Sequence, residues 1–133
     1  MSKIIIKTDK APAPIGPYNQ AVKAGNLLFV SGQIALDPAT GELVNKNIEE
    51  EANQVMKNIS AILKEAGASF EHIVKTTIFL SDMSLFAQVN EIYGKYFMSE
   101  GSGSTVNFPA RETVAVKGLP KNVNVEISVT AFL

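Results

Sequence analysis

Residues 122–130 read NVNVEISVT, a strict alternation of polar and apolar side chains. Successive side chains on a β-strand point to opposite faces of the sheet. The apolar residues of this stretch therefore share one face, and the polar residues, Glu126 among them, share the other. The pattern predicts a sheet that packs one face against a hydrophobic core and presents a polar second face.

The stretch before this strand places a cation near Glu126. Phe108-Pro109-Ala110-Arg111 joins a rigid turn to a guanidinium. We expect a hairpin turning at residues 118–122, whose antiparallel pairing sets Glu126 opposite Thr113, one side-chain step from Arg111 on the same face. Two interpretations stay open: an ion pair on a solvated sheet face, or a site in which Arg111 holds a substrate carboxylate and Glu126 handles a water.

The composition bounds the class of protein. The length of 133 residues predicts one domain spanning residues 1–133, and 46% hydrophobic against 19% charged residues argues against disorder.

A net charge of -1 without a basic patch argues against a nucleic-acid binder. The absence of cysteine excludes disulfides and thiolate catalysis, and one histidine, His72, cannot form a cluster, so no metal site is expected. The apolar run near the N-terminus is too short for a signal peptide or a membrane span, and we expect a cytoplasmic protein.

The first third of the chain reads as strands and turns. Lys3–Lys7 is an expected strand, and the proline-rich segment Ala11–Tyr18 is a stiff loop whose Tyr18 either walls a pocket or packs at the rim of the core. Short runs at Gln20–Ala24 and Leu27–Ser31 flank Gly25-Asn26 and predict a hairpin. Gly32, in mid-strand, marks a bulge or a close ligand contact.

Two helices and a strand are expected in the middle of the chain. Apolar residues recur at three and four positions over Asn47–Ala66, with Glu49, Glu50 and Glu51 in the first turn, where acidic groups suit the helix dipole and solubility. His72–Ser81 predicts a buried strand. A second helix, capped by Asp82 or Ser84, should end near Phe97 and carry Asn90 close to its apolar face, and Met98–Asn107 should be a loop.

The order of strands, helix, strand, helix and two strands, the last two over Glu112–Lys117 and Val123–Phe132, gives an α+β fold. We expect a two-layer sandwich with both helices on one face of the sheet. The other sheet face, neither core nor strongly charged, should meet a partner, and a homo-oligomer is the simplest choice.

Five blocks in this order resemble the Rid/YjgF family of reactive-intermediate (enamine/imine) deaminases. They extend over nearly the whole chain: Pro14–Tyr18, Phe29–Gln33, Val89–Tyr93, Phe108–Arg111, and Leu119–Lys121 followed by Val125–Ile127. The resemblance implies a chorismate-mutase-like fold, a mixed sheet with two helices on one face, and a homotrimer with clefts at the subunit interfaces. It also implies hydrolysis of 2-imino acids, such as 2-iminobutanoate and 2-iminopropanoate, to 2-keto acids and ammonia without a cofactor.

By position, the resemblance assigns three catalytic residues. Arg111 would bind the substrate carboxylate, Glu126 would activate the attacking water, and the backbone of Thr113 would help to hold that water. Ser31, Gly32 and Tyr18 would line the cleft, and Asn90 would support it from the second helix. These four positions would bind the substrate together with Arg111.

The sequence also departs from the family pattern. Glu112 stands where serine is common and could compete for Arg111 or alter substrate choice; Thr113 replaces a frequent cysteine, Ser128 replaces a frequent glutamate, and the Met98–Asn107 loop looks longer than usual. A non-catalytic trimer that binds a carboxylate metabolite is therefore an alternative to the enzyme. An RNA-acting protein is a third candidate, against which the net charge and the single histidine argue.

Overall fold

The structure, a computed structural model, describes residues 2–98 and 107–133. The loop predicted over Met98–Asn107 falls almost wholly on residues 99–106, which lie outside the described residues.

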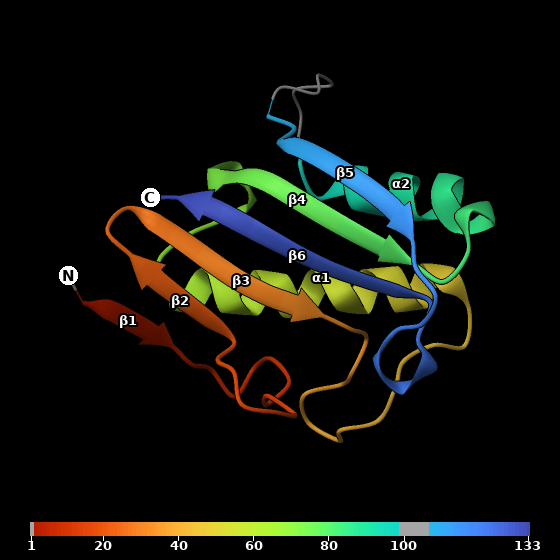
Figure 1. Cartoon of the computed structure of the whole chain (residues 1–133), viewed down its shortest axis with the longest axis horizontal. Coiled ribbons are helices and arrows are strands. Elements are labelled where there is room, and N and C mark those ends of the chain that lie inside the picture. Colours follow the sequence, from red (N-terminus) through yellow and green to blue (C-terminus); the bar gives the residue numbers. More distant parts are fainter. Residues whose placement is uncertain (1, 99–106) are drawn as a thin grey trace.

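A six-stranded sheet forms one layer of the molecule (Figure 1). Its strands are β1 (Lys3–Ile6), β2 (Ala21–Ala24), β3 (Leu27–Gln33), β4 (Ile73–Leu80), β5 (Ala110–Ala115) and β6 (Val125–Phe132). They lie in the order β1-β2-β3-β6-β4-β5. Only β5 is parallel to its neighbour; the other pairs are antiparallel. The sheet is therefore mixed, with β6 at its centre and β1 and β5 at its edges.

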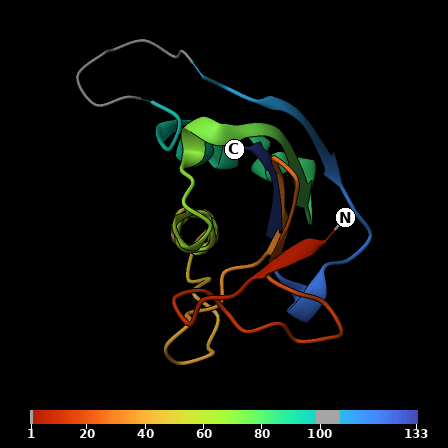
Figure 2. The same ribbon diagram turned by 90° about the vertical axis from the view of Figure 1, so that its left-hand side faces the viewer.

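Helices α1 (Ile48–Glu65) and α2 (Phe86–Lys95) cover one face of this sheet (Figure 2). The core lies between the layers, where Val55, Ile59 and Val89 of the helices join Ile78 and Ile127 of the sheet. The predicted α+β two-layer sandwich with both helices on one face is confirmed. Among the described residues, no helix is long and apolar enough to cross a bilayer.

Local signals set the ends of α1. The side chain of Asn47 accepts a hydrogen bond from the Glu50 backbone N–H and caps the N-terminus. The helix ends at Glu65, and Gly67 follows with φ +76°, a left-handed conformation that glycine adopts without strain. The expected helix Asn47–Ala66 is thus correct to within one residue at each end. The second helix is shorter than expected, because a 3-10 turn over Met83–Leu85, capped by Asp82, precedes α2.

The expected pairing of the last two strands is wrong. β5 runs parallel to β4 and pairs with it, whereas β6 pairs with the other side of β4. Thr113 therefore lies opposite Ile78, and Glu126 lies opposite Phe79. The connection between β5 and β6 steps across the end of β4 instead of closing a hairpin, with Lys121 and Asn122 at positive φ within it.

No helix or strand of residues 2–98 and 107–133 covers the sheet face away from the helices, which we call the open face. Ser128 and Thr130 of β6 are half-buried at its centre, flanked on β3 by the exposed Phe29 and on β6 by the exposed Phe132. This face is more apolar than the mixed polar face that the sequence predicted, since Leu27 and Val114 also are exposed on it.

Candidate active site

Glu126 projects from the central strand β6 onto the open sheet face, and Gly32 makes room for it. A Cβ atom built on Gly32 would lie 2.8 Å from Glu126 Oε2 and 2.9 Å from its Cδ. The pairing of β3 with β6 shifts register between Val30 and Gln33, so Gly32 lies in an irregular segment of the strand. Of the two explanations offered for Gly32, the irregular pairing supports the bulge, and the side chain that comes close to Gly32 is Glu126 of the same chain. The ligand contact at Gly32 stays a prediction.

A small hollow adjoins this carboxylate. Its volume is about 40 Å³, enough for a water molecule, and Tyr18, Gly32, Gln33, Pro120 and Glu126 are among its lining residues. We call it the carboxylate pocket. Burial raises the pKa of the Glu126 carboxyl above its usual value. A carboxylate with a raised pKa next to a space for water is a stronger base than an exposed one.

The wall of the carboxylate pocket is held by Gln20. This buried side chain donates to the carbonyls of Thr8, Ala11 and Pro12 and accepts from the Thr8 N–H. The proline-rich loop is thereby fixed, and the Ile15 N–H donates to Tyr18 Oη at 3.2 Å. Tyr18 thus lines a pocket, which was one of its two predicted roles. The role of Gln20 was not predicted, although a glutamine beside a loop rich in unpaired carbonyls is a usable signal.

Ser31, predicted to line the cleft, is not among the residues that line either pocket of this chain, but it binds the loop that carries Tyr18. Its hydroxyl donates to the Asn19 carbonyl at 2.6 Å, and its backbone N–H donates to the Gln20 carbonyl at 2.9 Å. Ser31 therefore attaches the loop that carries Tyr18 to β3.

Arg111 lies elsewhere, on the helix side of the edge strand β5. Its guanidinium carbon is 5.1 Å from the centre of the Tyr93 ring and 5.7 Å from that of Phe86, both on α2. A hollow of about 330 Å³ lies beside it, lined by Asn90, Tyr93, Gly94, Phe108, Pro109 and Arg111. We call it the guanidinium pocket. The aromatic rings fix the guanidinium without using its N–H donors, which suits capture of a carboxylate.

Tyr93, which lines the guanidinium pocket, is buried and hydrogen-bonded. The Tyr93 hydroxyl donates to Thr76 Oγ1 at 2.9 Å. Burial raises the pKa of Tyr93, and the nearby Arg111 charge acts in the opposite direction. Asn90 lines this pocket from α2, where the sequence placed it. The aromatic partners of Arg111 were not predicted to belong to a site, because Phe86 and Tyr93 follow the apolar period of the helix.

Thr113 is two residues beyond Arg111 on β5. Its side-chain oxygen is buried and has no hydrogen-bond partner among the described residues. It is opposite Ile78, on the face that carries the helices.

The two pockets do not meet within one chain. On β4, Arg111 pairs with Thr76 and Glu126 pairs with Phe79. The Cα atoms of Arg111 and Glu126 are therefore two strand spacings apart across the sheet and about three residues apart along it, a distance of roughly 14 Å. Their side chains also leave opposite faces of the sheet. A small substrate cannot touch both groups of the same chain.

Glu112 does not interact with Arg111. Strand alternation turns it to the open face, where its carboxylate is 3.0 Å from Lys75 Nζ and accepts a hydrogen bond from Thr77 Oγ1. The hydrogen bond from Thr77 and the pairing with Lys75 lower its pKa. The competition for the guanidinium considered from the sequence is thus absent within the chain.

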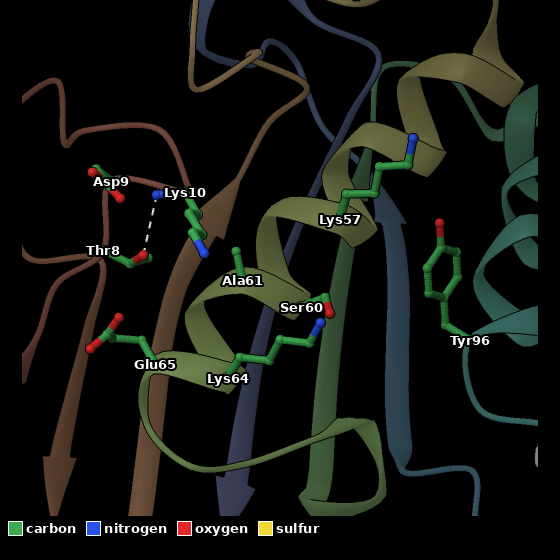
Figure 3. A pocket seen from close by; sticks show the side chains of 9 residues that line it. All are labelled: Thr8, Asp9, Lys10, Lys57, Ser60, Ala61, Lys64, Glu65 and Tyr96. Carbon is green, nitrogen blue, oxygen red and sulfur yellow. Dashed lines mark hydrogen bonds between the residues drawn. The ribbon is translucent and has the colours of Figure 1, made fainter.

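A larger hollow, about 540 Å³, lies on the outer side of α1 (Figure 3). Lys57, Ser60 and Lys64 line it from the helix, and Thr8, Asp9 and Lys10 line it from the loop after β1. None of the predicted site residues reaches it. Its charged side chains lie on the solvated face of an amphipathic helix, as is usual for such residues.

His72 and the described acidic residues offer no metal centre. Within residues 2–98 and 107–133 no three His, Asp or Glu side chains gather as a ligand set. His72 has a structural use: its Nδ1 accepts the Ser69 N–H at 3.0 Å at the start of a 3-10 turn.

The protein is a small α+β domain whose candidate site residues, in the carboxylate pocket and the guanidinium pocket, lie on both faces of one sheet. A family model described as "Endoribonuclease L-PSP" matches residues 8–133, and the chain belongs to this family, also called Rid/YjgF. It is 47% identical over 128 residues to a human protein named 2-iminobutanoate/2-iminopropanoate deaminase, covering 96% of this chain and 88% of that protein.

Solved structures agree with this assignment. A Rid-family protein of unknown function from Yersinia pestis, YyfA, superposes with a TM-score of 0.91 at 48% identity, covering 99% of this chain and all of the other. TdcF from E. coli, solved with bound serine, superposes with a TM-score of 0.89 at 38% identity and covers 98% of each chain. The expected family membership is confirmed.

Proposed function

We propose that this protein hydrolyses 2-imino acids such as 2-iminopropanoate and 2-iminobutanoate to 2-keto acids and ammonia. The observation that carries the proposal is the pair of pockets: a guanidinium held on aromatic rings, and a half-buried carboxylate beside a space for water. The deaminase name of the human relative supports it, as does the serine bound by TdcF, since serine carries the carboxylate that a 2-imino acid also carries.

In the proposed reaction, Arg111 pairs with the substrate carboxylate. The imine carbon of the bound substrate then faces Glu126. Glu126 removes a proton from a water in the carboxylate pocket while the oxygen of that water attacks the carbon. The C–N double bond becomes single, and protons pass to the nitrogen. The C–N bond then breaks, ammonia leaves and the keto acid remains, so one water is consumed for each ammonia released. Removal of the proton by a positioned carboxylate accelerates such a reaction roughly a hundred- to ten-thousandfold.

Because the pockets of one chain lie on opposite sheet faces, the proposed site joins the guanidinium pocket of one copy to the carboxylate pocket of another. A homotrimer that buries the open sheet face would bring them together. The exposed Phe29 and Phe132 give this face the apolar surface that such an interface uses. Thr113 lies on an edge strand, so part of its strand's backbone is open to a water or a neighbouring chain.

Two other functions remain to be separated by experiment. A carboxylate-binding regulator would use Arg111 in the same way without turnover, and the serine in TdcF fits that function equally well. The family description names an endoribonuclease. His72, the sole histidine, is engaged in capping the turn at Ser69, which disfavours its use in cleaving RNA.

The test is release of keto acid from the two imines generated in situ. We expect Arg111→Ala to lower kcat/KM about 10- to 100-fold, because charged hydrogen bonds to the substrate are lost. We expect Glu126→Ala to lower kcat about 100-fold or more. The exposed Lys117→Ala and Glu42→Ala serve as charge-matched controls. Wild-type protein that performs no better than buffer would refute the proposed activity, and binding of serine without turnover would then favour the regulator.

A further inference from the structure

Glu51 is a fully buried carboxylate that the proposed reaction does not use. It lies in the first turn of α1 with 0% of its surface exposed, between the exposed Glu49 and Glu50 on one side and Ala52 on the other. Glu51 lies in the first turn with the other two glutamates, as predicted, but the solubility role assigned to all three is wrong for this buried residue. The helical period places it with Ile48, Ala52 and Val55 on the apolar face, and that spacing could have identified it.

The buried carboxylate binds the beginning of β6. Its Oε2 accepts the backbone N–H groups of Asn124 at 2.7 Å and Val125 at 3.2 Å, and its Oε1 accepts the side-chain N–H of Asn124 at 2.9 Å. Hydrogen bonds from N–H groups offset the cost of burying a charge. Its partners are thus the two residues immediately before Glu126.

Asn124 extends this connection to β4. Its side-chain oxygen accepts from Ser81 Oγ at 3.0 Å, and its carbonyl accepts the Ser81 N–H at 2.9 Å. The N-terminus of α1, the end of β4 and the start of β6 therefore meet at one polar cluster. All of its hydrogen bonds fix the backbone position from which Glu126 projects.

The same cluster also fixes one wall of the carboxylate pocket. Pro120 lines that pocket, and the segment after it holds Lys121 and Asn122 at positive φ, a conformation that asparagine tolerates but that is unfavourable for lysine. Glu51 anchors the end of this segment where it becomes β6. Without the anchor, the strained segment and the first residues of β6 can relax together.

We propose that Glu51 is a positioning residue that sets the place of the Glu126 carboxylate through the backbone of Asn124 and Val125. The catalytic consequence rests on the proposed function. The structural consequence, a displaced Glu126 when Glu51 is lost, does not.

The experiment compares three variants in the full-length protein. Glu51→Leu fills the buried site with an apolar side chain of similar size, but it leaves the N–H groups of Asn124 and Val125 without their acceptor. Ile62→Ala, in the buried face of α1 near its other end, is a destabilised control that touches neither pocket. Glu51→Gln is the conservative variant, because its carbonyl oxygen can accept both backbone N–H groups. The Asn124 amide would turn over, so that its oxygen accepts from the new side-chain amide and its N–H donates to Ser81 Oγ.

We expect Glu51→Leu to lower kcat about 10- to 100-fold with little change in KM, since Arg111 is untouched and a misplaced base slows the chemical step. Ile62→Ala should lower the melting temperature and keep kcat, and Glu51→Gln should restore most of the kcat lost in Glu51→Leu. Equal kcat values for Glu51→Leu and Ile62→Ala would overturn the proposal.

A second measurement needs no turnover. Carboxyl-carbon NMR titration follows the Glu126 signal, assigned by its loss in Glu126→Gln. Glu51→Leu and the smaller Glu51→Ala both remove the acceptor of the Asn124 and Val125 N–H groups, and we expect the Glu126 signal and its titration midpoint to move in each folded variant relative to Ile62→Ala. If the signal and midpoint stay as they are in Ile62→Ala, the proposal fails; if they move while the wild type hydrolyses no imine, the proposed function alone has failed.

Discussion

Gly32 and Glu126 compete for the same space, which makes residue 32 a direct probe of the proposed base. In Gly32→Ala the new Cβ would lie 2.8 Å from Glu126 Oε2, so the carboxylate must rotate away. We expect a loss of about 10- to 100-fold in imine hydrolysis, because small displacements of a catalytic group cost that much. Gly118→Ala is the matched control, since a Cβ there meets nothing within 4 Å. Equal rates in the two variants would show that the position of Glu126 does not matter.

The raised pKa of Glu126 predicts how the stability of the protein depends on pH. Burial makes the folded chain bind a proton at Glu126 more tightly than the unfolded chain does. The stabilisation from this proton is present at low pH and is lost as the pH rises through the raised pKa. Glu126→Gln, which cannot ionise, should therefore melt at a higher temperature than the wild type at pH 7, and the difference should vanish below about pH 4.

Glu112 is a control for that experiment, because its pKa shift changes the stability of the protein with pH in the opposite direction. Thr77 and Lys75 lower its pKa, so its contribution is present at neutral pH and is lost as the pH falls through the lowered value. Glu112→Gln should melt at a lower temperature than the wild type at pH 7. Thermal melts of both variants from pH 3 to 8 test the two predicted directions together. A lower melting temperature for Glu126→Gln than for the wild type at pH 7 would contradict the prediction for Glu126.

At the scale of elements, local signals were sufficient for most of the fold. The three- and four-residue period and Asn47 located α1, and Gly25-Asn26 located the hairpin of β2 and β3. The alternation in β6 correctly gave its buried and open faces. Each of these features is decided by neighbours a few residues apart, which is why the sequence alone predicts them.

The strand that β5 pairs with could not be predicted from such local signals. Whether β5 joins β6 or β4 depends on a contact between segments about 35 residues apart, such as Arg111 beside Thr76. The burial of the two strands agrees with their positions in the sheet. In β6, fully buried residues alternate with half-buried ones, as in a central strand, whereas β5, at the edge, has no fully buried residue. Glu51 was missed for a related reason, since its partners Asn124 and Val125 are more than 70 positions away.

At the scale of the whole molecule, the separation of Arg111 and Glu126 becomes a prediction about assembly. If the reacting groups come from two copies, Arg111→Ala and Glu126→Ala each retain only their low residual activity alone, but the two variants complement each other when mixed. In a cyclic trimer that holds both variants, about a third of the interfaces combine an intact Arg111 with an intact Glu126. We therefore expect mixed oligomers to recover about a third of the wild-type rate.

The mixture is made by co-expressing the two variants with different tags and purifying on both tags in turn, so that only hetero-oligomers are assayed. Each variant co-expressed with itself gives the background rate. Phe29→Asp, added to both chains, places a charge on the open sheet face and should abolish assembly and recovery together. Hetero-oligomers of proven mass that recover no activity would place both groups in one chain's site. Because roughly 14 Å and a sheet separate them there, that outcome would also require β5 to move away from β4 during the reaction.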